Sequence, residues 1–176
     1  VVAIAFTLAV SSASRWGAAR ATQWAAWAAA APAPDTSAAL VDRLFAESKF
    51  DSVIHLAARA GVRPSLAEPI LYEDVNCIGT LRLLEAARHH GPANFVFASS
   101  SSVYGVNERV PFSESDPVDL PISPYATTKR AGELLCFNYS HLYGLRTSCL
   151  RFFTVFGAAQ RPEMAIAKFT DLLARG

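Results

Sequence analysis

The sequence has few cysteines, almost no net charge and no long apolar run, and each absence excludes a class of protein. The three cysteines, Cys77, Cys136 and Cys149, lie far apart without a C-x-x-C pair, which argues against a disulfide framework or a metal centre and favours a reducing cytoplasm. The 16 basic and 15 acidic residues give a formal net charge of +1, which disfavours a nucleic-acid binder that relies on a positive field. No apolar run approaches the roughly 20 residues that cross a bilayer. We therefore expect a soluble, cytoplasmic protein.

Glycine and acidic residues are also scarce at the start of the chain. Residues 1–34 contain one glycine, Gly17, all three tryptophans, many alanines and no acidic residue. Their first ten residues resemble a secretory signal only in part, because the basic region and the initiator Met are missing. The alternatives are a strand followed by an alanine-rich helix, or a segment that is not the native start of the domain. We expect residues 1–34 to be an atypical segment, with a non-native origin left open, and residues 35–176 to form the domain proper.

From Thr36 onward, strand and helix patterns alternate. Short apolar runs rich in β-branched residues predict strands buried on both faces, at 52–57, 94–99 and 147–153. Helical spacing predicts helices at about 40–49, 68–90 and 124–143, and a last helix that begins near residue 162. This alternation predicts an α/β fold, with right-handed crossovers and a parallel sheet covered by helices on both sides.

The polar residues with chemical potential follow the predicted strands, at the sheet edge where α/β proteins bind ligands. Four serines, Ser99 to Ser102, stand at the end of the second strand. Further along, Ser123 can cap a helix that begins at Pro124. This start places Tyr125 in the first helical turn and Lys129 one turn later, on the same face.

The spacing of Tyr125 and Lys129 suits acid–base chemistry. A free tyrosine, with a pKa of about 10, is a poor base at neutral pH. A nearby ammonium group and the positive end of the helix both favour the phenolate and so lower the tyrosine pKa. Tyr125 could then take a hydroxyl proton as a general base, while Ser100 holds the same substrate oxygen by a hydrogen bond. Because Y-x-x-x-K is common in helices, the capped helix start and the serine cluster carry this interpretation.

Five motifs occur in an order that is recognisable. They are His55–Arg63, Asn76–Thr80, Ser99–Gly105, Tyr125–Lys129 and Leu150–Gly157. Together they resemble the extended short-chain dehydrogenase/reductase family, in its NAD-dependent sugar-nucleotide epimerase and dehydratase branch. The resemblance covers about Leu40 to Gly176 and is greatest to the UDP-glucuronate 4-epimerase group. It implies a Rossmann-like, doubly wound parallel sheet.

The resemblance also implies roles for individual residues. Tyr125 would be the base, Lys129 its electrostatic partner and a ribose ligand, and Ser100 the hydroxyl that positions the sugar. Asn76 would support the turn beside the NAD cofactor, and Phe153 would pack near the nicotinamide. The other cofactor-binding positions that it implies are Leu56, Ala57, Ala58, Arg59, Ala60 and Ser99.

The two residues that follow the catalytic hydroxyl favour epimerisation over elimination. Dehydratases of the family carry an Asp-Glu pair just after the catalytic hydroxyl, whereas this chain has Ser101 and Ser102, which are not acids near neutral pH. Arg161 matches an arginine of the family that could anchor a uronate carboxylate through its two-pronged donors; a solvated arginine is an equal alternative. The implied substrate-binding residues are Ser100, Ser101, Ser102, Thr154 and Arg161. Where the family has Pro-Trp-Gly, residues 158–160 of this chain are Ala-Ala-Gln, so the identity of the nucleotide sugar stays open.

Two features of the family are missing from the sequence. The G-x-x-G-x-x-G turn that lets the backbone approach the pyrophosphate does not occur, and neither does the acidic end of the second strand, which would separate NAD from NADP. We also expect the C-terminal substrate lobe of the family to be absent. Residues 35–176 are therefore expected to form a partial NAD-binding domain, truncated at its N-terminus, which by itself binds NAD weakly or not at all.

Two alternatives to a UDP-glucuronate 4-epimerase stay open. One is a relative that acts on UDP-glucose or UDP-galactose. The other is a catalytically silent fragment that only folds or pairs with another chain. The resemblance further implies a homodimer formed through the two long helices.

Several other polar residues favour structural interpretations. His55 lies within a strand and is expected to be a core histidine with its hydrogen bond satisfied. Glu114 and Asp116 fall in a polar loop and are expected to face water. The cysteines are expected to be small core residues. The four serines lack a G-x-S-x-G elbow, which argues against a hydrolase nucleophile.

Overall fold

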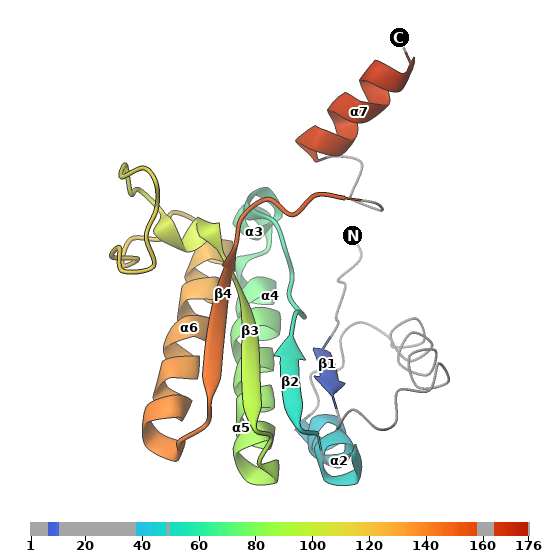
Figure 1. Ribbon diagram of the computed structural model, residues 1–176, viewed down its shortest axis with the longest axis vertical. Helices are drawn as coiled ribbons and strands as arrows, with labels where there is room; N and C mark the ends of the chain where they lie inside the picture. Colours follow the sequence, from blue (N-terminus) through green and yellow to red (C-terminus); the bar gives the residue numbers. More distant parts are fainter. Residues whose placement is uncertain (1–6, 11–37, 49, 158–163, 176) are drawn as a thin grey trace.

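The computed structural model describes residues 7–10, 38–48, 50–157 and 164–175. Within these residues, four strands form one sheet in the order β1-β2-β3-β4. Strands β2 (Ser52–His55), β3 (Asn94–Ser100) and β4 (Thr147–Phe152) are parallel, with Val53 opposite Phe95 and Phe97 opposite Cys149. The predicted parallel sheet is confirmed for these three strands. Strand β1 (Thr7–Val10) pairs antiparallel with β2, as Figure 1 shows.

Most predicted helices form close to their expected bounds. They are α2 (Ala38–Ser48), α6 (Pro124–Tyr143) and α7 (Ala165–Arg175), whereas α5 (Gly79–His90) begins well inside the predicted 68–90 helix. Gly91 and Gly144, with φ of 66° and 69°, end α5 and α6 in the left-handed conformation that a C-terminal glycine adopts readily. No helix in the described ranges is long and apolar enough to cross a membrane.

The predicted helix over residues 68–90 is more complex than its apolar pattern indicates. It consists of α4 (Pro69–Tyr72), a π-helical segment η1 (Glu73–Ile78) and then α5, in direct succession. A short helix that was not predicted, α3 (Val62–Ala67), precedes it. Six residues are too few to produce a clear helical period.

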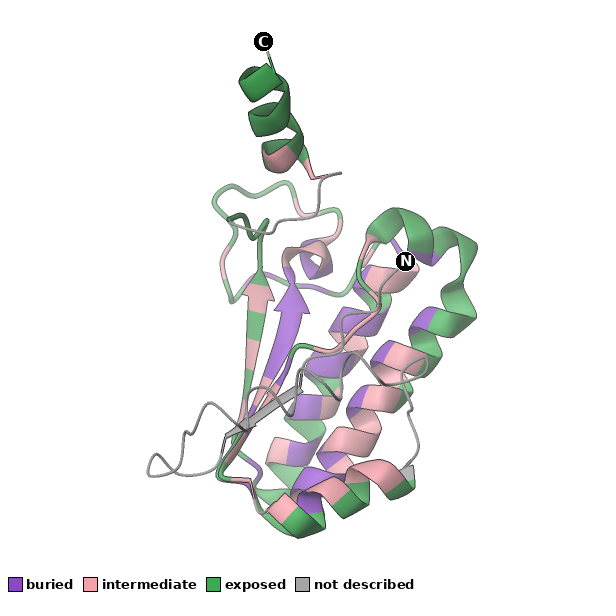
Figure 2. Ribbon diagram, turned by 90° about the vertical axis from the view of Figure 1, so that its right-hand side faces the viewer, coloured by how far each residue is buried: buried purple, intermediate pink, exposed green. Residues whose placement is uncertain are grey.

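The core lies between one face of the sheet and the layer of α2, α5 and α6 (Figures 1 and 2). Every second residue of β2 and β3 points into it, as the alternation along a strand requires. The buried members come from the sheet and from the helices: Phe45, Val53, Leu84, Ala86, Ala87, Phe95, Phe97, Cys136, Tyr139 and Leu145. This core fixes α6 along β3, which places the start of α6 beside the end of that strand.

The opposite face of the sheet is not covered by any described helix. Its side chains include Ile54 and Val96, which are half-buried, and Leu150, which is 44% exposed. Helix α7 contributes no buried residue and stands clear of the sheet in Figure 1. The expected cover on both faces is therefore found on one face only within the described ranges, although the apolar residues suited to a second layer are present.

Candidate active site

The candidate site lies at the carboxyl ends of the parallel strands, where the chain leaves β2, β3 and β4. The loop after β2, the 3₁₀ turn η2 (Ser101–Tyr104) after β3 and the segment after β4 emerge there, and the N-terminus of α6 lies beside them. The Ser123 hydroxyl caps α6 by accepting a hydrogen bond of 3.1 Å from the Ala126 backbone N–H, and Pro124 is the first helical residue. The predicted helix start is confirmed, and it sets the direction of the side chains that follow.

Tyr125 is half-buried in the first turn of α6. Its ring meets the ring of Tyr72 edge to face, with 6.3 Å between the centroids and an interplanar angle of 87°. Tyr72 is buried, and its hydroxyl donates to the Ala60 carbonyl oxygen at 2.9 Å. Tyr125 therefore lies beside a fixed aromatic wall that joins α4 to the loop after β2.

Lys129, one turn further on, is buried and only 4% exposed. Its Nζ donates a hydrogen bond of 2.7 Å to the Ala98 carbonyl oxygen of β3 and lies 5.0 Å from the centroid of the Phe97 ring. Burial lowers the pKa of the Lys129 ammonium group to about 8. Because little water screens this group, its field acts strongly on neighbouring groups.

Asn76 joins three segments of the site. Its Oδ1 accepts from the Arg59 backbone N–H at 2.7 Å, and its Nδ2 donates to the Arg59 carbonyl at 3.1 Å and to Thr128 Oγ1 at 2.9 Å. Thr128 Oγ1 in turn donates to the Tyr125 carbonyl at 2.9 Å. Asn76, from η1, thus fixes the backbone of the loop after β2 to the first turns of α6. That this loop holds NAD stays a prediction.

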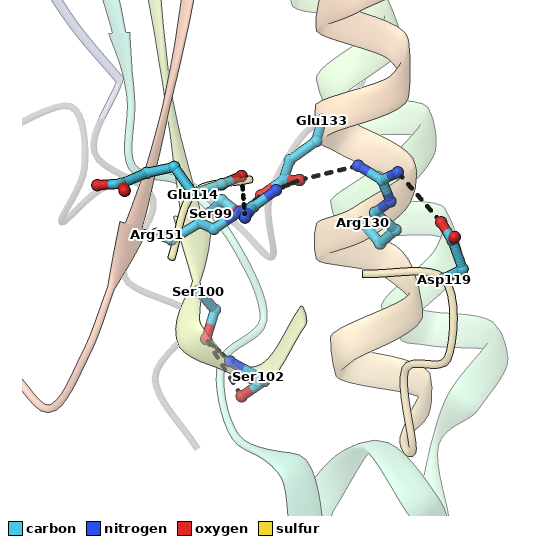
Figure 3. Close-up of polar contacts among 8 residues, drawn as sticks. All are labelled: Ser99, Ser100, Ser102, Glu114, Asp119, Arg130, Glu133 and Arg151. Carbon is cyan, nitrogen blue, oxygen red and sulfur yellow. Dashed lines mark hydrogen bonds and ion pairs between the residues drawn. The ribbon is translucent and has the colours of Figure 1, made fainter. Parts of the chain in front are cut away.

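Ser99 and Ser100, the last two residues of β3, point to opposite sides of the strand. Ser100 Oγ accepts a 3.2 Å hydrogen bond from the Ser102 backbone N–H, caps η2, and lies 3.2 Å from Ser102 Oγ. Ser99, one of the predicted cofactor positions, donates its hydroxyl to Glu133 Oε1 at 2.6 Å (Figure 3). Ser101 and Ser102 are half-buried beside Ser100. That Ser100 binds the substrate stays a prediction.

A buried ion network that the sequence analysis missed lies behind the serines. Glu133 of α6 is 7% exposed and binds Arg151 of β4 through both carboxylate oxygens, each at 3.0 Å. Arg130 Nη1 donates to the same carboxylate at 3.1 Å. Burial alone would raise the pKa of Glu133, but the hydrogen bonds from Arg151 and Ser99 hold it below its usual value.

One signal for this network is present in the sequence. Arg151 stands between Leu150 and Phe152 in an apolar strand, and an arginine there needs a partner. Glu133 continues the spacing of Tyr125 and Lys129 by four further residues, which puts its carboxylate on the same helix face.

The remaining predicted site residues differ in burial, and one of them lies outside the described part of the chain. Leu56 and Ala60 are exposed, and Ala57, Ala58 and Arg59 are half-buried, all in the loop after β2. Phe153 lies beside Tyr104 and Phe112, whose rings are stacked with centroids 4.6 Å apart. Thr154 is exposed after β4, and Arg161 lies outside the described residues.

Two expectations about loops and core residues had different outcomes. Asp116 was expected to face water, which is wrong. It is buried, and its carboxylate accepts from the Ser113 backbone N–H and from Asn107 Nδ2, both at 2.9 Å, which hold its pKa below the usual value. A polar loop can fold around one carboxylate, and composition does not reveal this. Glu114 is exposed, as expected.

His55 is a satisfied core histidine, as predicted. It is buried, and its Nε2 lies 2.9 Å from Thr80 Oγ1. Burial lowers its pKa to about 3. All three cysteines are free thiols; Cys136 is fully buried, while Cys77 and Cys149 are half-buried.

Comparison with known proteins assigns the chain to a family. The family model described as GDP-mannose 4,6 dehydratase matches residues 35–176. The chain belongs to the NAD-dependent epimerase/dehydratase family. The family acts on sugar nucleotides, and the match includes the five motifs and the whole candidate site.

Individual relatives are similar over most of this chain. A UDP-glucuronate 4-epimerase of Thermodesulfobacterium geofontis is 51% identical over 126 residues, which are 72% of this chain and 39% of the relative. The structure of a Bacillus cereus UDP-glucuronic acid 4-epimerase in complex with UDP-glucuronic acid and NAD gives a TM-score of 0.67 at 36% identity, over 77% of this chain and 42% of that one. A Thermotoga maritima UDP-glucose 4-epimerase with UDP-glucose gives 0.73 at 33% identity, over 80% and 47%. The chain spans about 40% of the length of the curated relatives that it matches.

Proposed function

We propose that the protein is the catalytic part of an NAD-dependent sugar-nucleotide 4-epimerase that acts on a UDP-glucuronate-like substrate. One observation carries this proposal. The buried ammonium group of Lys129 lies one helical turn from Tyr125, at an N-terminus of α6 that packs against the end of β3 carrying Ser100. The similarity to UDP-glucuronate 4-epimerases supports the choice of substrate class.

The residues at this sheet edge fit the nicotinamide half of NAD. The loop at 56–60 carries small side chains and is partly open, while Asn76 fixes its backbone. Lys129 offers a donor for ribose hydroxyls, and Phe153 an exposed ring for the nicotinamide. NAD held by these residues would supply reversible hydride transfer at C4 of the sugar, the redox chemistry that side chains alone lack. The expectation that the chain alone holds NAD weakly stays a prediction.

The chain's own residues bind the substrate and move one proton. Ser100 holds the 4-hydroxyl oxygen by a hydrogen bond, and the Tyr125 phenolate removes its proton. The Lys129 cation and the N-terminus of α6 stabilise that phenolate. When the alcohol re-forms, the Tyr125 phenol returns the proton to the same oxygen. Proton transfer of this kind contributes roughly 10²- to 10⁴-fold in rate.

Ser101 and Ser102 favour inversion over elimination. Expulsion of a leaving group from the sugar needs an acid near the reacting carbon, and a serine hydroxyl does not supply one near neutral pH. Both side chains are half-buried beside Ser100, where they offer hydrogen bonds to the sugar. Arg161 is proposed to pair with the uronate carboxylate, and Thr154 to contact the substrate.

Replacement of Tyr125 by Phe tests the proposal. Tyr125→Phe keeps the ring beside Tyr72 but removes the base, so the rate at which UDP-glucuronate is converted to its 4-epimer should fall by at least about 10²-fold. NMR of the reaction with added NAD measures this rate. Tyr143→Phe, at the exposed end of the same helix, is the matched control and should keep its activity.

An undiminished rate in Tyr125→Phe would overturn the mechanism. The same assay with UDP-glucose separates the proposed substrate from the runner-up, which the similarity to UDP-glucose 4-epimerases supports. If the protein converts neither substrate, the silent-fragment alternative is favoured.

A further inference from the structure

Glu133 lies where three parts of the candidate site meet. It belongs to α6, two turns after Tyr125 and one after Lys129. Its carboxylate accepts hydrogen bonds from the Ser99 hydroxyl of β3 and from the Arg151 guanidinium of β4 (Figure 3). Ser99 is the direct neighbour of Ser100. One buried carboxylate thus joins the catalytic helix to two of the three strands whose ends form the site.

The two arginines that Glu133 holds also reach the loop at 105–123, which connects η2 to α6. Arg151 Nη1 donates to the Glu114 carbonyl oxygen at 3.3 Å, and Arg130 pairs with the Asp119 carboxylate at 3.6 Å (Figure 3). The Arg151 guanidinium also lies 5.1 Å from the centroid of the Tyr104 ring in η2. The loop is therefore tied at two points to side chains that Glu133 itself orients.

We propose that Glu133 is a positioning residue, which through Ser99, Arg151 and Arg130 sets Ser100 and the 105–123 loop relative to Tyr125. This inference rests on the proposed function for its effect on rate. Glu133 does not touch the reacting atoms. It positions these groups because the planar guanidinium of Arg151 makes two hydrogen bonds to one carboxylate. Such a two-pronged pair fixes the orientation of the arginine as well as its distance. A displacement of about 1 Å at a reacting group can cost roughly 10²-fold in rate.

The test compares Glu133→Gln with Glu85→Gln. The glutamine side chain keeps the volume of the glutamate but lacks the charge that holds two arginines. Glu85 is the matched control, because it also binds an arginine and a hydroxyl, Arg88 at 2.7 Å and Tyr139, but far from the site on α5. Amide hydrogen exchange of the protein is measured segment by segment. We expect exchange at 99–120 to become at least about tenfold faster in Glu133→Gln and to stay unchanged there in Glu85→Gln.

Kinetics give the second readout. With NAD and UDP-glucuronate, and rates normalised to the folded fraction, Glu133→Gln should lower kcat at least about tenfold with little change in KM. Arg151→Lys keeps the charge but loses the two-pronged geometry, so it should show the same pattern more weakly; it also serves if Glu133→Gln does not fold.

The outcomes separate this inference from the proposed function. Unchanged exchange at 99–120 in the folded variants, or an equal rise along the whole chain, overturns the positioning role. So does an unchanged kcat in an active protein. If the unsubstituted protein converts no sugar nucleotide, the proposed function fails, and the local exchange pattern still decides whether Glu133 orders this edge of the sheet.

Discussion

Lys129 shows how a single residue can serve the site at a cost to the fold. Its ammonium group is buried, and burial lowers its pKa to about 8 from the usual 10.5. The unfolded chain therefore binds this proton more tightly than the folded protein does. Below pH 8 the folded state carries the full burial penalty. Between pH 8 and 10.5 only the unfolded state stays protonated, so the penalty shrinks as pH rises.

We expect Lys129→Met to be more stable but inactive. At pH 7 the variant should gain about 2 kcal/mol in free energy of unfolding, after allowance for the lost hydrogen bond to Ala98. Urea denaturation at pH 7 and pH 10 measures the gain, which should be smaller at pH 10. A variant less stable than the parent at pH 7, or a gain independent of pH, would contradict this explanation.

The buried imidazole of His55 should make the stability of the protein depend on pH below neutrality. Burial lowers its pKa to about 3 from 6.5, so as pH falls through this interval only the unfolded chain takes up the proton. Stability should therefore fall as the pH drops from 6.5 to about 3 in the parent protein. His55→Gln, which can still meet Thr80, should flatten this part of the curve in urea denaturation. An identical slope in both proteins would show that other groups dominate.

At the scale of elements, the approach of α6 to β3 depends on Gly132. A Cβ atom at this position would overlap the ring of Phe97, which is itself fully enclosed in the core. The absence of a side chain lets the helix lie close enough for Lys129 and Glu133 to reach Ala98 and Ser99. The catalytic helix is thus positioned by a residue with no chemistry of its own.

Gly132→Ala should destabilise the protein by about 1–3 kcal/mol, although alanine is the better helix former. The control is Gly79→Ala at the start of α5, where φ is −59° and nothing lies within 4 Å of the added Cβ. That change should stabilise by about 0.4–1 kcal/mol. Thermal and urea denaturation measure both, and equal effects of the two substitutions would show that the packing argument fails.

At the scale of the whole molecule, the outer face of α6 carries apolar side chains that no described segment covers. Leu134, Phe137 and Leu142 recur at helical spacing and are exposed, Phe137 by 65%. Ile70 of α4, whose helix packs against α6, is exposed as well. These exposed apolar side chains are consistent with the homodimer through the two long helices that the resemblance implies, because exposed apolar surface favours association.

Phe137→Glu should weaken or abolish such a dimer by placing a charge within the apolar contact. Light scattering after size-exclusion chromatography measures the mass. The control is Leu173→Glu on α7, an apolar position that is 83% exposed and lies away from the two helices. A mass that does not change in Phe137→Glu, or changes equally in both variants, contradicts the proposed interface.

The sequence by itself determined the positions of the three parallel strands, the capped start of α6 and its glycine end, because these follow from local periodicity and from backbone preferences of single residues. It also determined the family, since five motifs occur in order. The tertiary structure alone decided that Glu133 meets Ser99 and Arg151, that Asp116 is buried within its loop and that Asn76 joins Arg59 to Thr128. Tertiary packing brings these groups together. A buried charge needs a partner, and that partner is whichever side chain the fold makes its neighbour, which the spacing of residues along the sequence does not predict.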